Sequence, residues 1–265
     1  MPDTVHPSIN SPQNLIDALI GETDLTYLNE HFPRYLKTYQ LCSSRWHWKH
    51  AEVLDVGAHW LHQSILLSSL TDRITALDRP EVLRRDSVVQ TANRHAIKLM
   101  EMNDLNHPVE LEKIDENSID VIMFCEILEH LTFNPLAMWK AFYRVLKPGG
   151  RIILTTPNYY GSAALLRGLA RWAKGGGAGI SVDHILTMPT SHPHWKEYSL
   201  AELKAYFGLI SPDFQIGVAR QVSFLNGASF RWQRQVLNFV ERFVVGLRNG
   251  LYMEIDLPEK SRGIR

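Results

Sequence analysis

Residues 53–61 read Val-Leu-Asp-Val-Gly-Ala-His-Trp-Leu, an apolar run that passes through an acidic residue and a glycine. This order is typical of a buried strand, a tight glycine turn and the start of a helix, which residues 62–70 continue. A second apolar run, residues 74–77, ends at Asp78, 23 positions after Asp55. A carboxylate about 20 residues beyond the first strand is placed to accept hydrogen bonds from a ribose. The pattern therefore predicts a nucleoside-containing cofactor at these two strand ends.

The composition limits the class of protein. The chain has 265 residues, 45% of them hydrophobic, and its 28 basic residues balance 28 acidic ones. This length can form one α/β domain with a sizeable core, and the balanced charge argues against nucleic acid as a partner. Cys42 and Cys125 are too few for a disulfide framework. Because there is no signal-peptide pattern and no run of 18 apolar residues, we expect a cytoplasmic protein without a transmembrane segment.

Strand-like and helix-like stretches alternate along the middle of the chain. Further strands are expected at residues 97–102, 119–124 and 151–156, and helices at residues 80–96 and from Asn134 to a turn at residues 147–150. Strands that alternate with helices of this length predict an α/β fold with a doubly wound, mostly parallel sheet.

The C-terminal part predicts an antiparallel pair of strands that closes this sheet. Ser199 and Glu202 form a capping box at the start of a helix. Strands are then expected at residues 214–222 and 251–257, with a helix between them whose apolar face carries Val236, Val240, Phe243 and Leu247.

Two segments outside this core are expected to contact a substrate. Residues 1–50 predict a helical cap before the main domain at residues 51–265, with a first helix beginning at Ser11-Pro12 and a packing helix within residues 24–48. In the second of these, His31, Arg34 and Tyr35 are candidates for substrate contact. Residues 159–195 contain Gly-Gly-Gly-Ala-Gly at 175–179, which predicts either a mobile lid or a solvated linker.

Five ordered segments carry a family resemblance. They are Val-Leu-Asp-Val-Gly at 53–57, Ala-Leu-Asp at 76–78, Asn-Ser-Ile-Asp-Val-Ile-Met-Phe-Cys-Glu-Ile-Leu-Glu-His-Leu at 117–131, Leu-Lys-Pro-Gly-Gly-Arg-Ile-Ile-Leu-Thr-Thr-Pro-Asn at 146–158 and His-Trp-Lys-Glu-Tyr-Ser at 194–199. In this order they resemble the class I S-adenosylmethionine-dependent methyltransferases. The resemblance implies a seven-stranded Rossmann-like sheet with an antiparallel C-terminal hairpin, and an enzyme that uses S-adenosylmethionine.

The resemblance also implies a cofactor site. The first-strand turn, with Asp55, Gly57 and Ala58, would face the methionine part, and Asp78 would bind the ribose. Asp104 and Leu105 would lie beside the adenine. Cys125 and Glu126 would lie near the methyl group.

The chain departs from the family in the glycine turn. His59 and Leu61 stand where the family pattern has its second and third glycines. Since glycine there lets the backbone approach a ligand, His59 is expected either to shift the loop or to project its ring into the pocket.

Methyl transfer is an in-line displacement, so the enzyme gains mainly by aligning acceptor, methyl group and sulfur. A hydroxyl acceptor also benefits from a base, and His130 and His194 are the candidates, with Glu129 beside them. If a helix begins near Glu126, then Glu126, Glu129 and His130 share one of its faces. Glu129 could instead serve a structural role by tying the start of that helix to the sheet.

The predicted function is transfer of a methyl group to an oxygen, less readily a nitrogen, of a small molecule or saccharide. One alternative is a domain that keeps the fold, binds no cofactor and acts as a binding protein. Another is a metal-dependent RNA 2′-O-methyltransferase, because Glu126-x-x-Glu129-His130 and His194-x-x-Glu197 resemble the metal-binding segments of the small-RNA 2′-O-methyltransferases. The acceptor, the oligomeric state and a divalent metal at these residues stay open.

Overall fold

The computed structural model describes residues 12–19, 25–173, 194–224 and 232–265. Ser11 and the glycine-rich part of the predicted lid at residues 175–179 lie outside these ranges.

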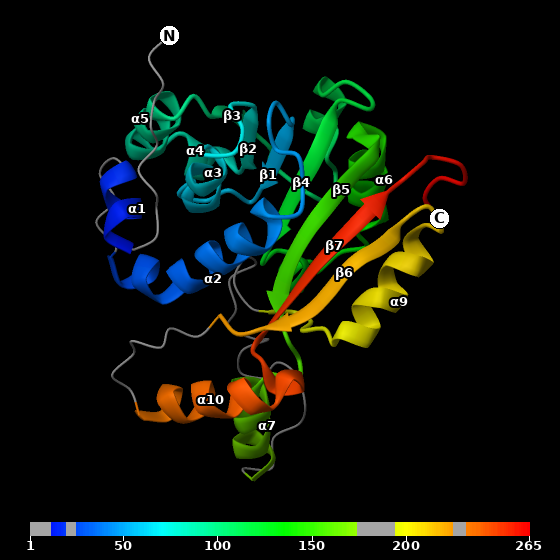
Figure 1. The fold of residues 1–265 in the computed structure, drawn as a ribbon. Coiled ribbons are helices and arrows are strands. Elements are labelled where there is room, and N and C mark those ends of the chain that lie inside the picture. The colour runs from blue at the N-terminus through cyan, green and yellow to red at the C-terminus, as the bar shows by residue number, and fades with distance from the viewer. Residues whose placement is uncertain (1–11, 20–24, 174–193, 225–231) are drawn as a thin grey trace.

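The chain forms one seven-stranded sheet in the order β3-β2-β1-β4-β5-β7-β6 (Figure 1). The strands β1 to β5 are parallel, whereas β7 runs antiparallel to both of its neighbours, β5 and β6. The strands are β1 Val53–Val56, β2 Ile74–Asp78, β3 Lys98–Glu101, β4 Ile119–Cys125, β5 Leu146–Pro157, β6 Gln215–Val222 and β7 Gly250–Leu257. The predicted mostly parallel sheet with an antiparallel C-terminal hairpin is therefore confirmed.

Helices cover both faces of the sheet (Figure 1). The α-helices are α1 Pro12–Ala18, α2 Leu25–Ser43, α3 His62–Leu67, α4 Pro80–Leu83, α5 Asp86–Arg94, α6 Leu136–Val145, α7 Ser162–Ala173, α9 Leu200–Ile210 and α10 Trp232–Phe243, and the 3-10 turns are η1 Val109–Lys113, η2 Leu128–His130 and η3 Val245–Leu247.

Alternating side chains of the central strands divide the core into two clusters. In β4, Val121 and Met123 pack with residues of α1, α2 and α3 on one face. Ile122 and Phe124 pack with α6 and α9 on the other. The near-continuous apolar sequence of β4 is what a parallel strand buried on both faces requires.

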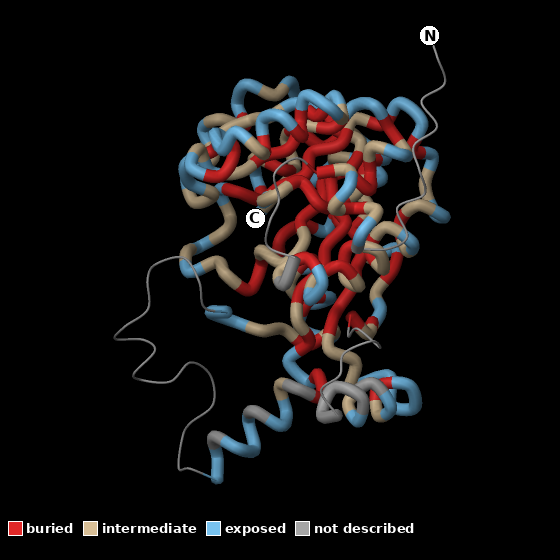
Figure 2. Tube along the Cα trace, turned by 90° about the vertical axis from the view of Figure 1, so that its left-hand side faces the viewer, coloured by how far each residue is buried: buried red, intermediate tan, exposed pale blue. Residues whose placement is uncertain are grey.

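Helix α2 lies where the cap was predicted, and it extends over the loop that follows β1. Its Tyr35 ring lies 5.2 Å from the ring of the buried His62 in α3. Buried residues gather in the sheet and its flanking helices, whereas α7 and α10 at one end are largely exposed (Figure 2). Within the described part of the chain, no helix combines the length and the apolar character that a membrane span needs.

Three predicted boundaries are wrong. The helix expected at residues 80–96 is split into α4 and α5, because Arg85 is extended (φ −66°, ψ 132°) and acts as the N-cap of α5. Leu247 lies in η3, after α10 has ended.

The start of the fifth strand is the third error. The strand expected from Arg151 begins at Leu146, directly after α6 ends at Val145, and Gly150 pairs with Leu257 of β7. A Cβ on Gly150 would lie 2.9 Å from two backbone oxygens, so a close strand contact, rather than a helix stop, accounts for this glycine.

Candidate functional site

The carboxyl ends of β1, β2 and β4 meet at one edge of the sheet. Val56 is in register with Leu77 of β2 and with Phe124 of β4. Directly beyond this register, the Gly57 N–H donates to the Leu77 carbonyl at 2.7 Å. Ligands of open parallel sheets bind outside this edge, at the point where the strand order reverses, which here is between β1 and β4.

The turn after β1 has a left-handed backbone at three positions. The φ angles are +69° at Gly57, +49° at His59 and +65° at Leu61. The two residues that replace family glycines thus keep a backbone that glycine adopts most easily, at about 1–2 kcal/mol of strain each. At Gly57 the left-handed backbone is the main reason for glycine, since a Cβ there would lie 2.7 Å from Ile127 Cδ1, the end of a flexible side chain that can move.

The ring of His59 lies between the turn and the cap. Its centroid is 5.4 Å from that of Tyr27 in α2 and 5.7 Å from that of Trp60. Its backbone N–H meanwhile donates to Asp78 Oδ2 at 2.7 Å. The substitution therefore adds an aromatic contact to the cap while the turn stays bonded to β2.

Asp78 ends β2 with its carboxylate half-buried. Besides the His59 N–H on Oδ2, it accepts the Arg79 N–H on Oδ1 at 2.7 Å. Burial raises the pKa of Asp78, and these two backbone hydrogen bonds oppose that rise. Since each carboxylate oxygen can accept two hydrogen bonds, Asp78 retains capacity for two neighbouring hydroxyls.

Asp55 lies beneath the turn and not on its surface. Only 3% of the residue is exposed, and its Oδ2 accepts the Ser64 hydroxyl of α3 at 2.5 Å. Burial raises the pKa of Asp55 to about 7. The side chain joins β1 to α3, so any effect on a ligand would pass through the position of the turn.

The raised pKa predicts a pH-dependent stability. The folded state binds a proton on Asp55 up to about pH 7, whereas the unfolded chain loses it near pH 3.8, so the free energy of unfolding should fall as pH rises between these values. Asp55→Asn should remove this fall and stabilise the protein at pH 8 by a few kcal/mol, on the order of 1.4 kcal/mol per pKa unit. Urea titrations from pH 4.5 to 8 measure the free energy of unfolding, and Asp72→Asn, at an exposed carboxylate, is the control. If the free energy of unfolding of Asp55→Asn falls with pH as steeply as that of the wild type, the prediction is wrong.

Glu126 follows β4 and turns toward the cap. It has a left-handed backbone (φ +57°), and its Oε2 lies 3.3 Å from Arg34 Nη1 of α2, with 16% of each side chain exposed. The helix expected to begin near Glu126 is therefore wrong, because only η2 forms there and Glu126 does not share a face with Glu129 and His130. The preceding Cys125 is a free thiol whose pKa burial raises to about 12.

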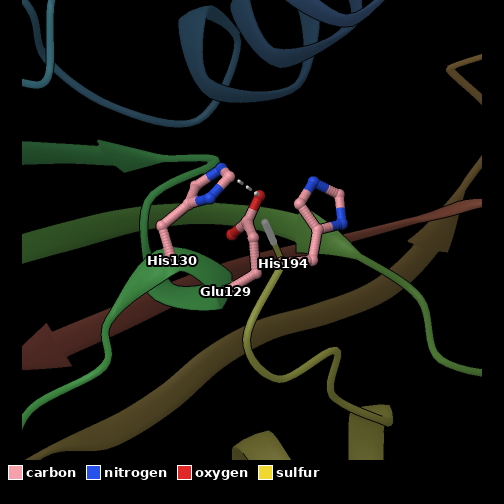
Figure 3. Close-up of side chains that lie close together, drawn as sticks. All are labelled: Glu129, His130 and His194. Carbon is pink, nitrogen blue, oxygen red and sulfur yellow. Dashed lines mark ion pairs between the residues drawn. The ribbon is translucent and has the colours of Figure 1, made fainter. Parts of the chain in front are cut away.

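Glu129, His130 and His194 form one cluster, in which the Glu129 carboxylate lies between the two imidazole rings (Figure 3). His130 Nε2 is 3.9 Å from Glu129 Oε1, and the ring centroids of His130 and His194 are 5.0 Å apart. Burial raises the pKa of Glu129 well above its usual range, and the nearby Glu126 adds to the rise. The structure thus brings together the three residues predicted to be catalytic.

Backbone and side-chain bonds hold this cluster in place. The fully buried Glu129 accepts the Thr156 hydroxyl on Oε2 at 2.9 Å. Its carbonyl accepts the N–H groups of Trp195 and Lys196 at 2.6 and 3.2 Å, which joins η2 to the segment that carries His194. Thr156 was not predicted, although a hydroxyl at the end of an otherwise apolar strand could have indicated it.

The residues predicted to lie beside an adenine follow β3. Asp104 is half-exposed and accepts hydrogen bonds from His107 Nδ1 at 3.0 Å and from the Asn106 N–H at 2.8 Å. The His107 bond, followed by the Asn106 bond, lowers the pKa of Asp104. Leu105 packs against the second core cluster. Their role with an adenine stays a prediction.

The acceptors at this edge suit a ligand that combines hydroxyl groups with positive charge. Asp78 has spare acceptor capacity, and Glu126 Oε1 is buried without a hydrogen-bond partner among the described residues. A buried carboxylate oxygen in this state favours a cationic or hydrogen-bond-donating group beside it. The residues present therefore fit a nucleoside that carries a cationic chain.

Comparison with known proteins gives one family. The model of the methyltransferase domain family matches residues 54–154. The chain is 29% identical over 161 residues to the ubiquinone biosynthesis O-methyltransferase of Xanthomonas oryzae pv. oryzae, a match that covers 59% of this chain and 60% of that protein. The chain thus matches only about 60% of the length of this curated relative.

Solved structures show the same fold at low identity. A methyltransferase from Haloferax volcanii, solved in complex with the Trm112 methyltransferase activator, has a TM-score of 0.58 at 15% identity and covers 85% of this chain and 91% of its own. A SAM-dependent methyltransferase from Aquifex aeolicus has a TM-score of 0.50 at 15% identity, with 93% and 98% covered.

Proposed function

We propose that the chain is a class I S-adenosylmethionine-dependent methyltransferase, and that it transfers a methyl group to an oxygen of a small molecule or saccharide. The cofactor of this family, when bound, supplies a methyl group on a cationic sulfur. The name of the Xanthomonas relative, an O-methyltransferase, supports oxygen over nitrogen as the acceptor atom.

The proposed cofactor site uses the edge at β1, β2 and β4. Asp78 accepts the ribose hydroxyls, and the turn at residues 57–59 faces the methionine part from above Asp55. Asp104 and Leu105 flank the adenine. Cys125 and Glu126 lie near the methyl group, where Glu126 Oε1 has no hydrogen-bond partner within the described part of the chain and offers an acceptor to a cationic ligand.

The main support for oxygen as the acceptor atom is the pair of imidazoles, His130 and His194, at this edge of the sheet. His130 and His194 are 35% and 42% exposed in their side chains and lie beside each other, so an acceptor hydroxyl can reach either ring. A neutral imidazole in that position would take the proton of the acceptor hydroxyl, and the sulfur of a bound cofactor would leave as the methyl group is transferred. In this proposal Glu129 positions the two rings.

In this proposal the segments before and after the central strands surround the acceptor pocket. The cap at residues 1–50 bounds the acceptor pocket, since Arg34 of α2 pairs with Glu126 beside the methyl position. The lid expected at residues 159–195 stays a prediction, because residues 174–193 lie outside the described part. A cytoplasmic location stays a prediction.

Calorimetric titration of the purified protein with S-adenosylmethionine and S-adenosylhomocysteine tests the proposal. Micromolar affinity, roughly −8 kcal/mol, is expected. His130→Ala and His194→Ala should then lower methyl transfer to phenolic or saccharide acceptors, by up to about 100-fold or more, with cofactor affinity unchanged. Absence of cofactor binding would overturn the proposal in favour of a binding protein that only keeps the fold.

Two observations favour this function over its alternatives. The left-handed backbone retained at His59 and Leu61 supports a working cofactor turn over a domain that has lost its cofactor. The equal numbers of basic and acidic residues support a small acceptor over RNA, which is bound chiefly through clustered positive charge.

A further inference from the structure

We propose that Glu129, His130 and His194 bind one divalent transition-metal ion at the carboxyl edge of the sheet. Each residue offers a ligand atom, and these three atoms lie within 4.8 Å of one another. Ligand atoms on a metal with bonds near 2.1 Å are separated by roughly 3–3.5 Å. Small rotations of the two partly exposed histidines close the difference, because both rings already flank the carboxylate (Figure 3).

The orphaned oxygen of Glu129 is the observation that points to a cation. Glu129 Oε2 is occupied by the Thr156 hydroxyl, whereas Oε1 is buried without a hydrogen-bond partner among the described residues. Oε1 is also the atom that faces His130 Nε2 at 3.9 Å, a separation too long for a hydrogen bond and suited to a shared ion. A fully buried carboxylate oxygen without a hydrogen-bond partner destabilises the fold, and a bound cation would compensate this cost.

The second histidine is oriented for the same role. His194 Nδ1 lies 3.1 Å from Glu197 Oε1, so that carboxylate can hold the Nδ1 proton and leave the Nε2 lone pair for a metal. The two backbone bonds from Trp195 and Lys196 to the Glu129 carbonyl fix the segment that carries this ring. The site is therefore built from two loops that are already tied together.

The structure also restricts which carboxylates take part. Sequence spacing alone groups Glu126 with Glu129 and His130. In the structure the backbone of Glu126 is left-handed, and its side chain pairs with Arg34 of the cap. The proposed ligands are thus one carboxylate and two imidazoles.

This ligand set indicates the class of metal. Two imidazoles and a carboxylate suit Zn²⁺, Mn²⁺, Co²⁺ or Fe²⁺, whereas Mg²⁺ and Ca²⁺ prefer oxygen ligands throughout. Three protein ligands leave positions open for water or an acceptor hydroxyl. The imidazole base of the proposed function describes the metal-free protein, because with the metal bound both histidines are ligands and their lone pairs are no longer available for a proton.

The test is titration of the chelator-treated full-length protein with Co²⁺, Mn²⁺ and Zn²⁺ separately, without S-adenosylmethionine. We expect one ion per chain at micromolar affinity or better, visible-range absorption from bound Co²⁺, and a higher Tm with metal. His194→Ala changes a partly exposed segment, and Glu129→Gln keeps the side-chain shape and the Thr156 bond. Each should lower affinity at least 10-fold and remove the Tm rise.

The matched control is His50→Asn, which removes another half-exposed imidazole near a carboxylate, Asp72, while asparagine tolerates its left-handed backbone. This variant should bind metal as the wild type does. Absence of metal binding, or equal affinity in wild type, Glu129→Gln and His194→Ala, would overturn the site. Because no cofactor is present, failure here is distinct from failure of the proposed methyltransferase activity, which a separate S-adenosylmethionine titration reports.

Discussion

Asp78→Ala is expected to weaken binding of S-adenosylmethionine by about 100-fold while the fold stays intact. A hydrogen bond to a charged acceptor contributes about 1.5–3 kcal/mol, and the proposal gives Asp78 two ribose hydroxyls. The change also frees the N–H groups of His59 and Arg79, while the Gly57 N–H keeps its bond to the Leu77 carbonyl of β2. Calorimetric titration at fixed salt measures the affinity, and circular dichroism checks the fold.

His59→Gly is the matched control for this prediction. It keeps the backbone N–H that Asp78 accepts, removes the ring that contacts Tyr27, and relieves the left-handed backbone at φ +49°. Cofactor affinity should therefore be kept or increased. Wild-type affinity in Asp78→Ala would remove Asp78 from the ribose role, and a large loss in His59→Gly would make the imidazole a cofactor contact.

Arg34→Met is expected to destabilise the fold by about 3 kcal/mol. Only 16% of the Arg34 and Glu126 side chains is exposed, so their ion pair is weakly screened, and removing one partner of such a pair typically costs about 3–5 kcal/mol. The change would leave the Glu126 carboxylate without its cation beside the buried Glu129. Urea unfolding near pH 7.5 measures the loss.

Two further variants separate the ion pair from other effects. The double variant Arg34→Met with Glu126→Gln removes the unpaired charge and should recover most of the stability. Arg84→Met breaks a bidentate but exposed pair with Glu101 and should change stability little. Wild-type stability in Arg34→Met, or no recovery in the double variant, would contradict the assigned role of the pair.

The regular elements were predictable because their signals are local. The apolar runs of β1, β2 and β4, the turn at Gly57 and the capping box at Ser199 each depend on neighbouring residues. The structure shows all of these, including both hydrogen bonds of the capping box. The break between α4 and α5 was missed because an extended residue at Arg85 has no signal comparable with proline or glycine.

Within the candidate site, too, local sequence predicted some features and only the structure revealed the others. The positions of Asp55 and Asp78 at the ends of neighbouring strands followed from sequence, because parallel strands place their carboxyl ends at one edge. That Asp55 lies beneath the turn, bonded to Ser64, did not follow, since a strand pattern says nothing of which residues are covered by a helix.

The sequence by itself determined the fold class, the resemblance to one family and the chemical character of the strand ends. These depend on periodicity and on ordered local segments. Only the tertiary structure decided that Glu126 turns to Arg34, away from Glu129, His130 and His194, which the resemblance had already grouped. Such contacts join segments far apart in the chain, and they depend on the handedness of single residues and on the backbone bonds between loops. No local pattern carries that information.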